Sequence, residues 1–328
     1  MSECVHIPML SIHPDRINMY SSVEWFPDRK RAKPKFDIRT VDNQHNGKIS
    51  EAAHRKVSKA IEYLLFMSHS KSLPDSHHGR AYNFKIAFIT LTLPSTQQHS
   101  DNDIKHECLN QLLIELRRKW RVRNYIWRAE KQKNGNIHFH ILCDKFVPWS
   151  ELRDCWNRIC NKLGYVDRYR EQMKAFHAGG IKIREDLLKK WDYKKQIKAY
   201  QAGKANDWNS PNSTDVHSIK KVSNIKSYVC KYLAKNEQTE GLTGRLWGCN
   251  VELSNIPGAR LIIDNKVTDQ LNHLLTTLKP DLYVGDHFTT MYVNATMLSR
   301  SACADLFNHF ASFLVSHFGF SPQLEFSG

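Results

Sequence analysis

The sequence predicts an α+β protein, because its central part contains strand-like and helix-like segments in turn. Residues 84–93 (FKIAFITLTL) are rich in β-branched and aromatic side chains, as in a buried strand. Residues 122–130 and 136–143 are two further strand-like segments, and the Asn-Gly pair between them is typical of a hairpin. Residues 103–119 and 150–163 carry apolar side chains at the spacing of an amphipathic helix.

The strand over 136–143 contains the sequence HFH, with histidines at positions 138 and 140. Side chains alternate between the two faces of a strand, so His138 and His140 share one face while Phe139 points to the other. Two imidazoles on one strand face can hold a single divalent ion. The alternative is two histidines on a solvated strand face, because short patterns of this kind recur by chance.

Glu130 is the candidate third ligand, and the length of the hairpin loop decides whether it can serve. A two-residue turn at 134–135 would place Glu130 opposite Phe139, on the wrong face. A three-residue loop at 133–135, with its glycine at positive φ, would place Glu130 opposite His138. A metal site made of Glu130 and the two histidines therefore requires the longer loop.

The charge balance indicates a polyanionic partner. The 328 residues contain 48 Lys and Arg against 33 Asp and Glu, a formal net charge of +15. Such an excess is typical of proteins that bind nucleic acid and, second, of those that bind acidic membranes. The sequence has no recognisable signal peptide and no stretch apolar enough to span a membrane, so we expect no membrane partner and a cytoplasmic location. The eight cysteines form no CxxC pair, which fits reduced thiols.

We expect three parts along the chain: an N-terminal basic arm and helix over 1–80, a main domain over 81–258, and a C-terminal extension over 259–328. Residues 1–46 are mixed and turn-rich, so we expect a loosely packed arm, followed by a helix over 50–66. The extension ends in an amphipathic helix that Ser299 can cap.

Residues 164–205 combine cations with aromatic rings. The lysines at 189, 190, 194, 195 and 198 lie near Trp191, Tyr193 and Tyr200 in the sequence. This mixture suits single-stranded nucleic acid, because cations meet phosphates and rings can stack on bases. The alternative is a solvated helix whose aromatic side chains face the core.

Residues 222–235 (VSNIKSYVCKYLAK) form the second informative segment. At about 100° per residue on a helix, one side carries an apolar stripe and a second arc carries Tyr228, Lys231, Tyr232 and Lys235. Each tyrosine is followed three positions later by a lysine on the same face. A lysine one turn from a phenol favours the phenolate, which a nucleophilic tyrosine needs near neutral pH. The alternative is that the tyrosines flank a core stripe while the lysines extend into solvent.

Three motifs occur in order along the chain, namely FITLTLP at 88–94, HFHIL at 138–142 and YVCKYLAK at 228–235, with a strand-like GRLWGCN at 244–250. Together they resemble the motifs of rolling-circle replication initiators of the HUH (His-hydrophobe-His) endonuclease superfamily. The chain is most similar to the initiators of small single-stranded DNA phages and related plasmids, including the filamentous-phage gene II type.

The resemblance implies the HUH endonuclease fold, a largely antiparallel central sheet flanked by helices, with both histidines on a central strand and the tyrosine helix across it. It implies that His138 and His140 bind Mg²⁺ or Mn²⁺, with Glu130 matching the acidic third ligand of some members. Tyr228 would be the leading nucleophile and Tyr232 a second one.

Lys231 would orient the phosphate or assist the phenol, and Lys235 has the corresponding position after Tyr232. The implied activity is nicking of a single-stranded DNA origin, with a 5′-phosphotyrosyl intermediate and a free 3′-OH. The implied partners beyond the origin are the replication helicase and polymerase of a bacterial host. Alternatives are a transposase or relaxase with the same chemistry, or a non-catalytic protein that binds single-stranded nucleic acid.

Overall fold

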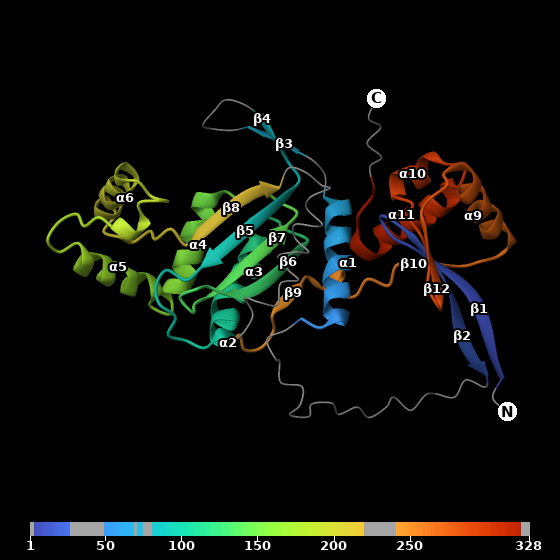
Figure 1. Ribbon diagram of the computed structural model, residues 1–328, viewed down its shortest axis with the longest axis horizontal. Coiled ribbons are helices and arrows are strands. Elements are labelled where there is room, and N and C mark those ends of the chain that lie inside the picture. Colours follow the sequence, from blue (N-terminus) through green and yellow to red (C-terminus); the bar gives the residue numbers. More distant parts are fainter. Residues whose placement is uncertain (1–2, 27–48, 69–70, 75–80, 220–240, 323–328) are drawn as a thin grey trace. The chain divides into compact units, whose positions relative to one another are not determined.

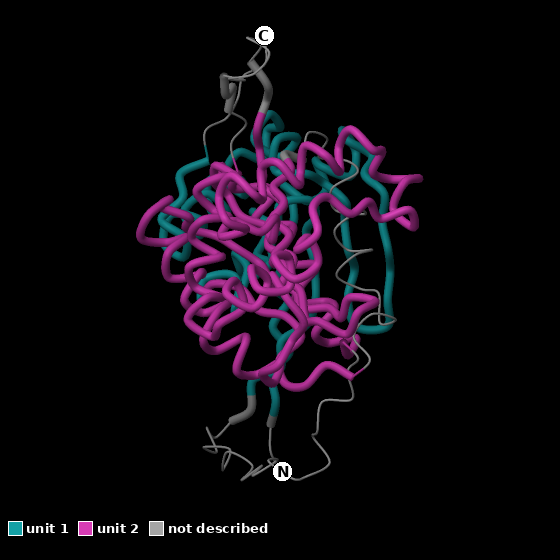
Figure 2. The backbone as a smooth tube through the Cα atoms, turned by 90° about the vertical axis from the view of Figure 1, so that its left-hand side faces the viewer, with its two compact units in different colours: residues 1–44, 251–328 teal, residues 45–250 magenta. Residues whose placement is uncertain are grey.

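The computed structural model describes most of the chain, in five stretches: residues 3–26, 49–68, 71–74, 81–219 and 241–322 (Figure 1). The chain divides into two compact units, one of residues 1–44 with 251–328 and the other of residues 45–250 (Figure 2). Each unit contains a five-stranded sheet in which every neighbouring pair of strands is antiparallel.

The sheet of the second unit has the histidine strand at its centre. Its order is β8-β5-β7-β6-β9. The strands are β5 (Ile86–Thr92), β6 (Tyr125–Lys131), β7 (Ile137–Cys143), β8 (Thr214–Ile219) and β9 (Trp247–Cys249). The predicted α+β fold with a largely antiparallel sheet is therefore confirmed, and both histidines of the HFH motif lie on the central strand.

One face of this sheet carries a hydrophobic core under a layer of helices. The helices are α2 (Asp101–Asp103), the π-helical segment η2 (Ile104–Leu109), α3 (Asn110–Arg118) and α4 (Trp149–Asn161). Alternate strand residues such as Leu91, Ala129 and Phe139 point into this core. The ring of Phe139 meets Trp156 of α4 edge-on, with 6.3 Å between ring centroids. Both predicted helices of this region are present, and the core fixes the other face of the strands as the one that carries the histidines.

The second unit also contains the predicted helix before the sheet. Helix α1 (Glu51–Met67) begins after Ser50, whose side chain accepts a hydrogen bond from the backbone N–H of Ala53 at 3.2 Å. Its apolar side is buried, and the helix contacts β6. Strands β3 (Lys71–Pro74) and β4 (Ala81–Phe84) follow it and pair with each other.

An insertion lies between α4 and β8. It contains α5 (Tyr165–Phe176), a short 3-10 helix η3 (Glu185–Leu187) and α6 (Tyr193–Ala205). Both α-helices project from the sheet in Figure 1. Residues 164–213 are called the α5–α6 insertion below.

The first unit combines the two ends of the chain. Its sheet has the order β10-β1-β2-β12-β11. Its strands are β1 (Glu3–Ile12), β2 (Ile17–Phe26), β10 (Ala259–Ile262), β11 (Leu282–Val284) and β12 (Phe288–Met291), and its helices are α8 (Val251–Ser254), α9 (Asn265–Thr277), α10 (Ala295–Arg300) and α11 (Ala304–Phe318). Among the helices that the structure describes, none is both long and apolar enough to cross a membrane.

The expected loosely packed arm is wrong for the part that the structure describes. Residues 3–26 form a ten-by-ten-residue hairpin in which Leu10, Ile12 and Ile17 are buried. The physical reason is long-range pairing: β1 pairs with β10 and β2 with β12, strands from the far end of the chain. Local sequence patterns do not reveal such pairing, because each strand gains its partners only in the folded chain.

The two units also differ from the expected parts 1–80, 81–258 and 259–328, since α1 lies in the second unit and β1 and β2 join the C-terminal residues. Ser299 lies inside α10 instead of capping the last helix, which is preceded by Cys303. The predicted apolar face of that helix is confirmed, because Leu306, Phe310 and Leu314 of α11 are buried.

The hairpin between β6 and β7 has the three-residue loop that the metal site requires. The backbone N–H of Gln132 donates to the carbonyl of Asn136 at 2.8 Å, and that of Gly135 donates to the carbonyl of Gln132 at 2.9 Å. Gly135 has a φ of 83°. As a result, Glu130 pairs with His138. The predicted register is confirmed.

Substitution of Gly135 tests the backbone requirement of this loop. A Cβ atom at this position would contact nothing within 4 Å, so any cost comes from the positive φ alone. We expect Gly135→Ala to lower the free energy of unfolding by about 1 kcal/mol, and Gly135→Asn to lower it less, because asparagine tolerates the left-handed region better. Urea unfolding followed by circular dichroism measures both. An alanine variant as stable as the wild type would contradict this account of the loop.

Candidate metal centre

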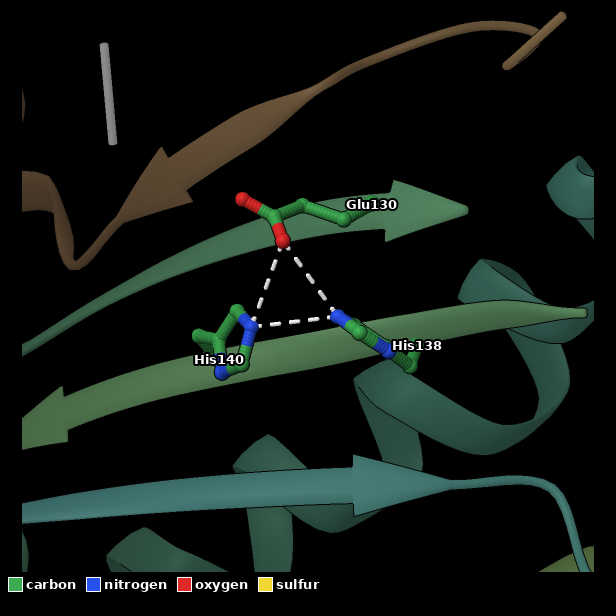
Figure 3. A group of neighbouring side chains, drawn as sticks. All are labelled: Glu130, His138 and His140. Carbon is green, nitrogen blue, oxygen red and sulfur yellow. Dashed lines mark hydrogen bonds and ion pairs between the residues drawn. The ribbon is translucent and has the colours of Figure 1, made fainter. Parts of the chain in front are cut away.

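Glu130, His138 and His140 converge on one point beside the central strand (Figure 3). The Nε2 atoms of the two histidines are 3.1 Å apart, and Oε2 of Glu130 lies 3.4 Å from each of them. Within the described stretches, this is the one group of three or more His, Cys, Asp or Glu side chains close enough to share a metal ion. The structure thus brings together all three predicted ligands.

Strand pairing explains why these side chains meet. On β7, His138 and His140 alternate with the core residue Phe139 and therefore share the face opposite the core. On β6, Glu130 lies directly opposite His138 and Arg128 directly opposite His140. Side chains at directly opposed positions lie about 5 Å apart at Cβ, which brings the carboxylate within reach of both imidazoles.

Neighbouring groups hold the ring of His140 in place. The Oγ1 atom of Thr90 on β5 lies 3.1 Å from its Nδ1, and the ring of Phe88 stacks on it with 5.1 Å between centroids. The tautomer in which Nδ1 donates to Thr90 leaves the lone pair of Nε2 directed at the shared point. This is the usual arrangement of a metal-binding histidine, in which the outer nitrogen is held by a hydrogen bond.

Arg128 holds the carboxylate of Glu130 from the other side. Its Nε lies 3.2 Å from Oε1 of Glu130, and the two side chains are only 0% and 2% exposed. Oε1 therefore faces the guanidinium while Oε2 faces the imidazoles. A buried carboxylate needs such partners, because an unpaired buried charge is strongly destabilising.

The same partners determine the ionisation of Glu130. Burial raises the pKa of its carboxyl group, but hydrogen bonds to His138 and His140 and the charges of His140 and Arg128 outweigh burial and hold the pKa at about 2. Burial lowers the pKa of Arg128, and the carboxylate opposes that effect. The site therefore presents a carboxylate, and not a carboxylic acid, at neutral pH.

The donor set and its spacing fit a divalent metal ion. Imidazole nitrogen and carboxylate oxygen are ligands that Mn²⁺ and related ions accept, and carboxylate suits Mg²⁺. Two ligand atoms that bind one ion at about 2.1 Å lie roughly 3.0 to 3.4 Å from each other in octahedral or tetrahedral geometry. The three separations observed here are 3.1, 3.4 and 3.4 Å. The group is therefore arranged as a set of ligands for one ion would be.

The other predicted site residues, Tyr228, Lys231, Tyr232 and Lys235, lie outside the described residues. What the structure gives is the position of the flanking strands. The segment 220–246 connects β8 to β9, which are the two opposite edges of the sheet.

Sequence reasoning missed two residues that position the ligands, Arg128 and Thr90. Arg128 was within reach, because the three-residue loop that pairs Glu130 with His138 also pairs Arg128 with His140. Thr90 was not, because its role depends on β5 being the neighbour of β7, and strand order is not written in local sequence.

Comparison with known families gives a match over the same part of the chain. Residues 86–237 match the family of the replication-associated ORF2 and gene II proteins. This segment belongs to a family of rolling-circle replication initiators. No curated protein and no solved structure matches the chain.

The match to the replication initiator family contains both informative regions of the sequence. It begins at the start of β5, includes Glu130, His138 and His140, and extends past the tyrosine motif at 228–235. The group of potential metal ligands is therefore part of the replication initiator segment.

The depressed pKa of Glu130 predicts an acid-sensitive contribution to stability. Its pKa in the folded protein, about 2, is below the ordinary value of 4.5. The stabilisation is therefore complete above about pH 4.5 and is lost as the pH falls towards 2. In metal-free buffer we expect the difference in unfolding free energy between the wild type and Glu130→Gln to shrink on acidification, by on the order of 3 kcal/mol over the whole range.

Urea unfolding at several pH values between 3 and 7 measures this difference. Glu107→Gln, at an exposed glutamate of the same unit, controls for acid effects that are not specific to the site. A difference between wild type and Glu130→Gln that stays constant with pH would contradict the predicted ionisation.

Proposed function

We propose that the protein initiates replication by nicking single-stranded origin DNA through metal-assisted tyrosine transesterification. The observation that carries this proposal is the convergence of Glu130, His138 and His140 within the segment that belongs to the replication initiator family. The family supplies the biological process, and the three side chains supply a site for the ion that this chemistry uses.

We infer that the ion is Mg²⁺ or Mn²⁺. When bound, such an ion polarises a phosphodiester and stabilises the negative charge that develops on its oxygens. Glu130, His138 and His140 would hold the ion, while Arg128 orients the carboxylate and Thr90 orients His140. The imidazole side chains are 16% and 13% exposed, so this side of the group is the one that a phosphate would approach.

Tyr228 is the proposed leading nucleophile. Its phenolate oxygen would form a bond to phosphorus while the bond from phosphorus to the 3′ oxygen breaks. The departing oxygen takes up a proton and becomes a free 3′-hydroxyl, and the 5′ end of the DNA stays on the protein as a phosphotyrosine. Lys231 would orient the phosphate or assist the phenol, and Lys235 would act in the same way beside Tyr232.

The sheet topology supports a path for the tyrosine segment past the histidines. Strands β8 and β9 are separated by the three inner strands, so their connection spans four strand spacings, about 19 Å at about 4.8 Å each. The helix that the sequence predicts over 222–235 would be about 21 Å long. A helix of that length suits the connection. The opposite face of the sheet already carries η2, α3 and α4, which favours a crossing on the histidine face.

A second tyrosine would allow the product to be closed as well as opened. Tyr232 can attack after one round of synthesis while Tyr228 still holds the first end. The free 3′-hydroxyl would serve the replication polymerase of a bacterial host, with a host helicase opening the duplex, in the cytoplasm where both are found. A transposase or relaxase would use similar chemistry, but the family match is to replication-associated proteins.

A covalent adduct between protein and DNA tests this proposal. Labelled single-stranded fragments of the replicon that encodes the protein are incubated with Mn²⁺ or Mg²⁺ and analysed on denaturing gels. We expect a metal-dependent adduct that His138→Ala and the double variant Tyr228→Phe/Tyr232→Phe both lose. Tyr228→Phe alone should reduce the adduct more than Tyr232→Phe.

A matched control is Tyr283→Phe, at an exposed tyrosine of the other unit that should not affect the adduct. If no fragment forms an adduct while all variants bind DNA equally well, the nickase proposal is wrong. The protein would then be a non-catalytic DNA-binding member of its family.

A further inference from the structure

The α5–α6 insertion is a basic element with almost no core of its own. It contains eleven Lys and Arg against six Asp and Glu. Residues 167–210 are all described, and Gln196 is the only one of them that is buried. Helices α5 and α6 therefore expose nearly all of their side chains, which is unusual for helices that serve only to fill space in a domain.

The aromatic rings of the insertion fall into two groups. His177, Tyr200 and Trp208 pack together: the ring of His177 lies 4.8 Å from Tyr200 and stacks on Trp208 at 5.9 Å. This cluster joins the end of α5 to α6. By contrast, Trp191 and Tyr193 are 46% and 54% exposed and make no ring contact among the described residues.

Cations surround these two exposed rings. Four lysines, Lys189, Lys190, Lys194 and Lys198, are exposed and form no ion pair with any described residue. Other cations of the insertion are paired with carboxylates, namely Lys174 with Asp207, Arg184 with Asp186 and Lys195 with Asp192. On α6, Tyr193 and Ile197 follow one line along the helix and Lys194 and Lys198 follow the adjacent line. The exposed rings thus lie beside uncompensated positive charge.

The insertion leaves and rejoins the sheet at the end where the metal centre lies. At its start, the buried Tyr165 receives hydrogen bonds on its hydroxyl oxygen from the backbone N–H groups of Gln98 and His99. At its end, the carbonyl of Ser213 accepts hydrogen bonds from the backbone and the side chain of Thr92, at 2.8 and 3.1 Å. Thr92 pairs with His138 across the sheet.

We propose that the α5–α6 insertion is a docking surface for single-stranded DNA, and that it leads the strand to the metal centre. The four unpaired lysines would contact phosphates, and Trp191 and Tyr193 would stack on bases. Stacking requires bases that are not already stacked in a duplex, so the exposed rings favour a single strand. The choice of DNA as the nucleic acid rests on the proposed function.

Binding measured without metal tests this proposal. Fluorescence anisotropy in EDTA is recorded with labelled oligo(dT) of about 20 nucleotides, longer than the usual site of one such surface, and with a duplex of equal length. We expect the single strand to bind more tightly than the duplex. Trp191→Ala/Tyr193→Ala should weaken single-strand binding roughly tenfold or more, as for the loss of stacked bases.

Charge is tested through the salt dependence of binding. Lys189→Gln/Lys190→Gln should reduce the slope of log K against log salt by about 1.4, at about 0.7 per phosphate contact on a single strand. Arg117→Gln/Arg118→Gln, at two exposed arginines of α3, removes the same charge elsewhere in the unit and should leave most of the slope. Trp149→Ala, at a tryptophan of α4 that is 52% exposed, is the matched control for the rings and should change the affinity less than twofold.

Two results would overturn the proposal. One is a Trp191→Ala/Tyr193→Ala variant that binds the single strand as tightly as Trp149→Ala does. The other is a duplex that binds as well as the single strand. Trp208→Ala disrupts the packed ring cluster and shows how the assay responds when the insertion itself is destabilised.

Failure of this proposal is distinguishable from failure of the nickase. Binding in EDTA does not need metal or tyrosine, so a protein that forms no adduct can still lose binding when Trp191 and Tyr193 are removed. Conversely, a metal-dependent adduct together with unchanged binding by the ring variant would refute the insertion alone.

Discussion

The loop between β6 and β7 is the constraint on which the site depends. Because side chains alternate along a strand, a change of one residue in the loop moves every β6 side chain to the other face relative to β7. With the three-residue loop, Glu130 faces His138 and Arg128 faces His140. With a two-residue loop, Glu130 would face the core residue Phe139, and an uncompensated carboxylate would enter an apolar layer. The positive φ of Gly135 is therefore a condition of the chemistry as well as of the turn.

The electrostatics of the site follow from this register. Arg128 and Glu130 are both buried, and a charge in that position is stable only with a close partner of opposite sign. Arg128 satisfies one carboxylate oxygen and leaves the other for the histidines. The arrangement keeps the carboxylate ionised while its surroundings are largely closed to water. A cation at the shared point would be attracted by that charge, and its ligands would need little rearrangement.

The sequence predicted the chemistry of the central strand better than it predicted the organisation of the chain. The strands around the HFH motif, the loop length and the convergence of Glu130 with both histidines follow from alternation and turn geometry, which are local properties. The hairpin at the start of the chain was missed because its partners, β10 and β12, come from the other end. For the basic stretch at 164–205, neither alternative fits completely. Tyr200 packs in a ring cluster while Trp191 and Tyr193 are exposed, and a helical pattern without a core cannot separate these cases.

The functional picture joins two features of one unit. The metal centre lies on the histidine face of the sheet, and the α5–α6 insertion is attached at the same end of the strands through Thr92 and Ser213. A site that cuts a flexible polymer needs both a reactive centre and a surface that positions the strand. The separation of these two roles on different elements allows each to be tested without the other.

Calorimetric titration of Mn²⁺ into the protein tests the central claim, that hairpin register creates the metal centre. We predict one ion bound per chain in the wild type and in His106→Ala, an exposed histidine distant in sequence from the motif. His140→Ala and deletion of Asn134, which shortens the loop to two residues, should both abolish binding while circular dichroism shows a folded protein. If the Asn134 deletion binds Mn²⁺ as tightly as the wild type, the register of Glu130 does not create the site.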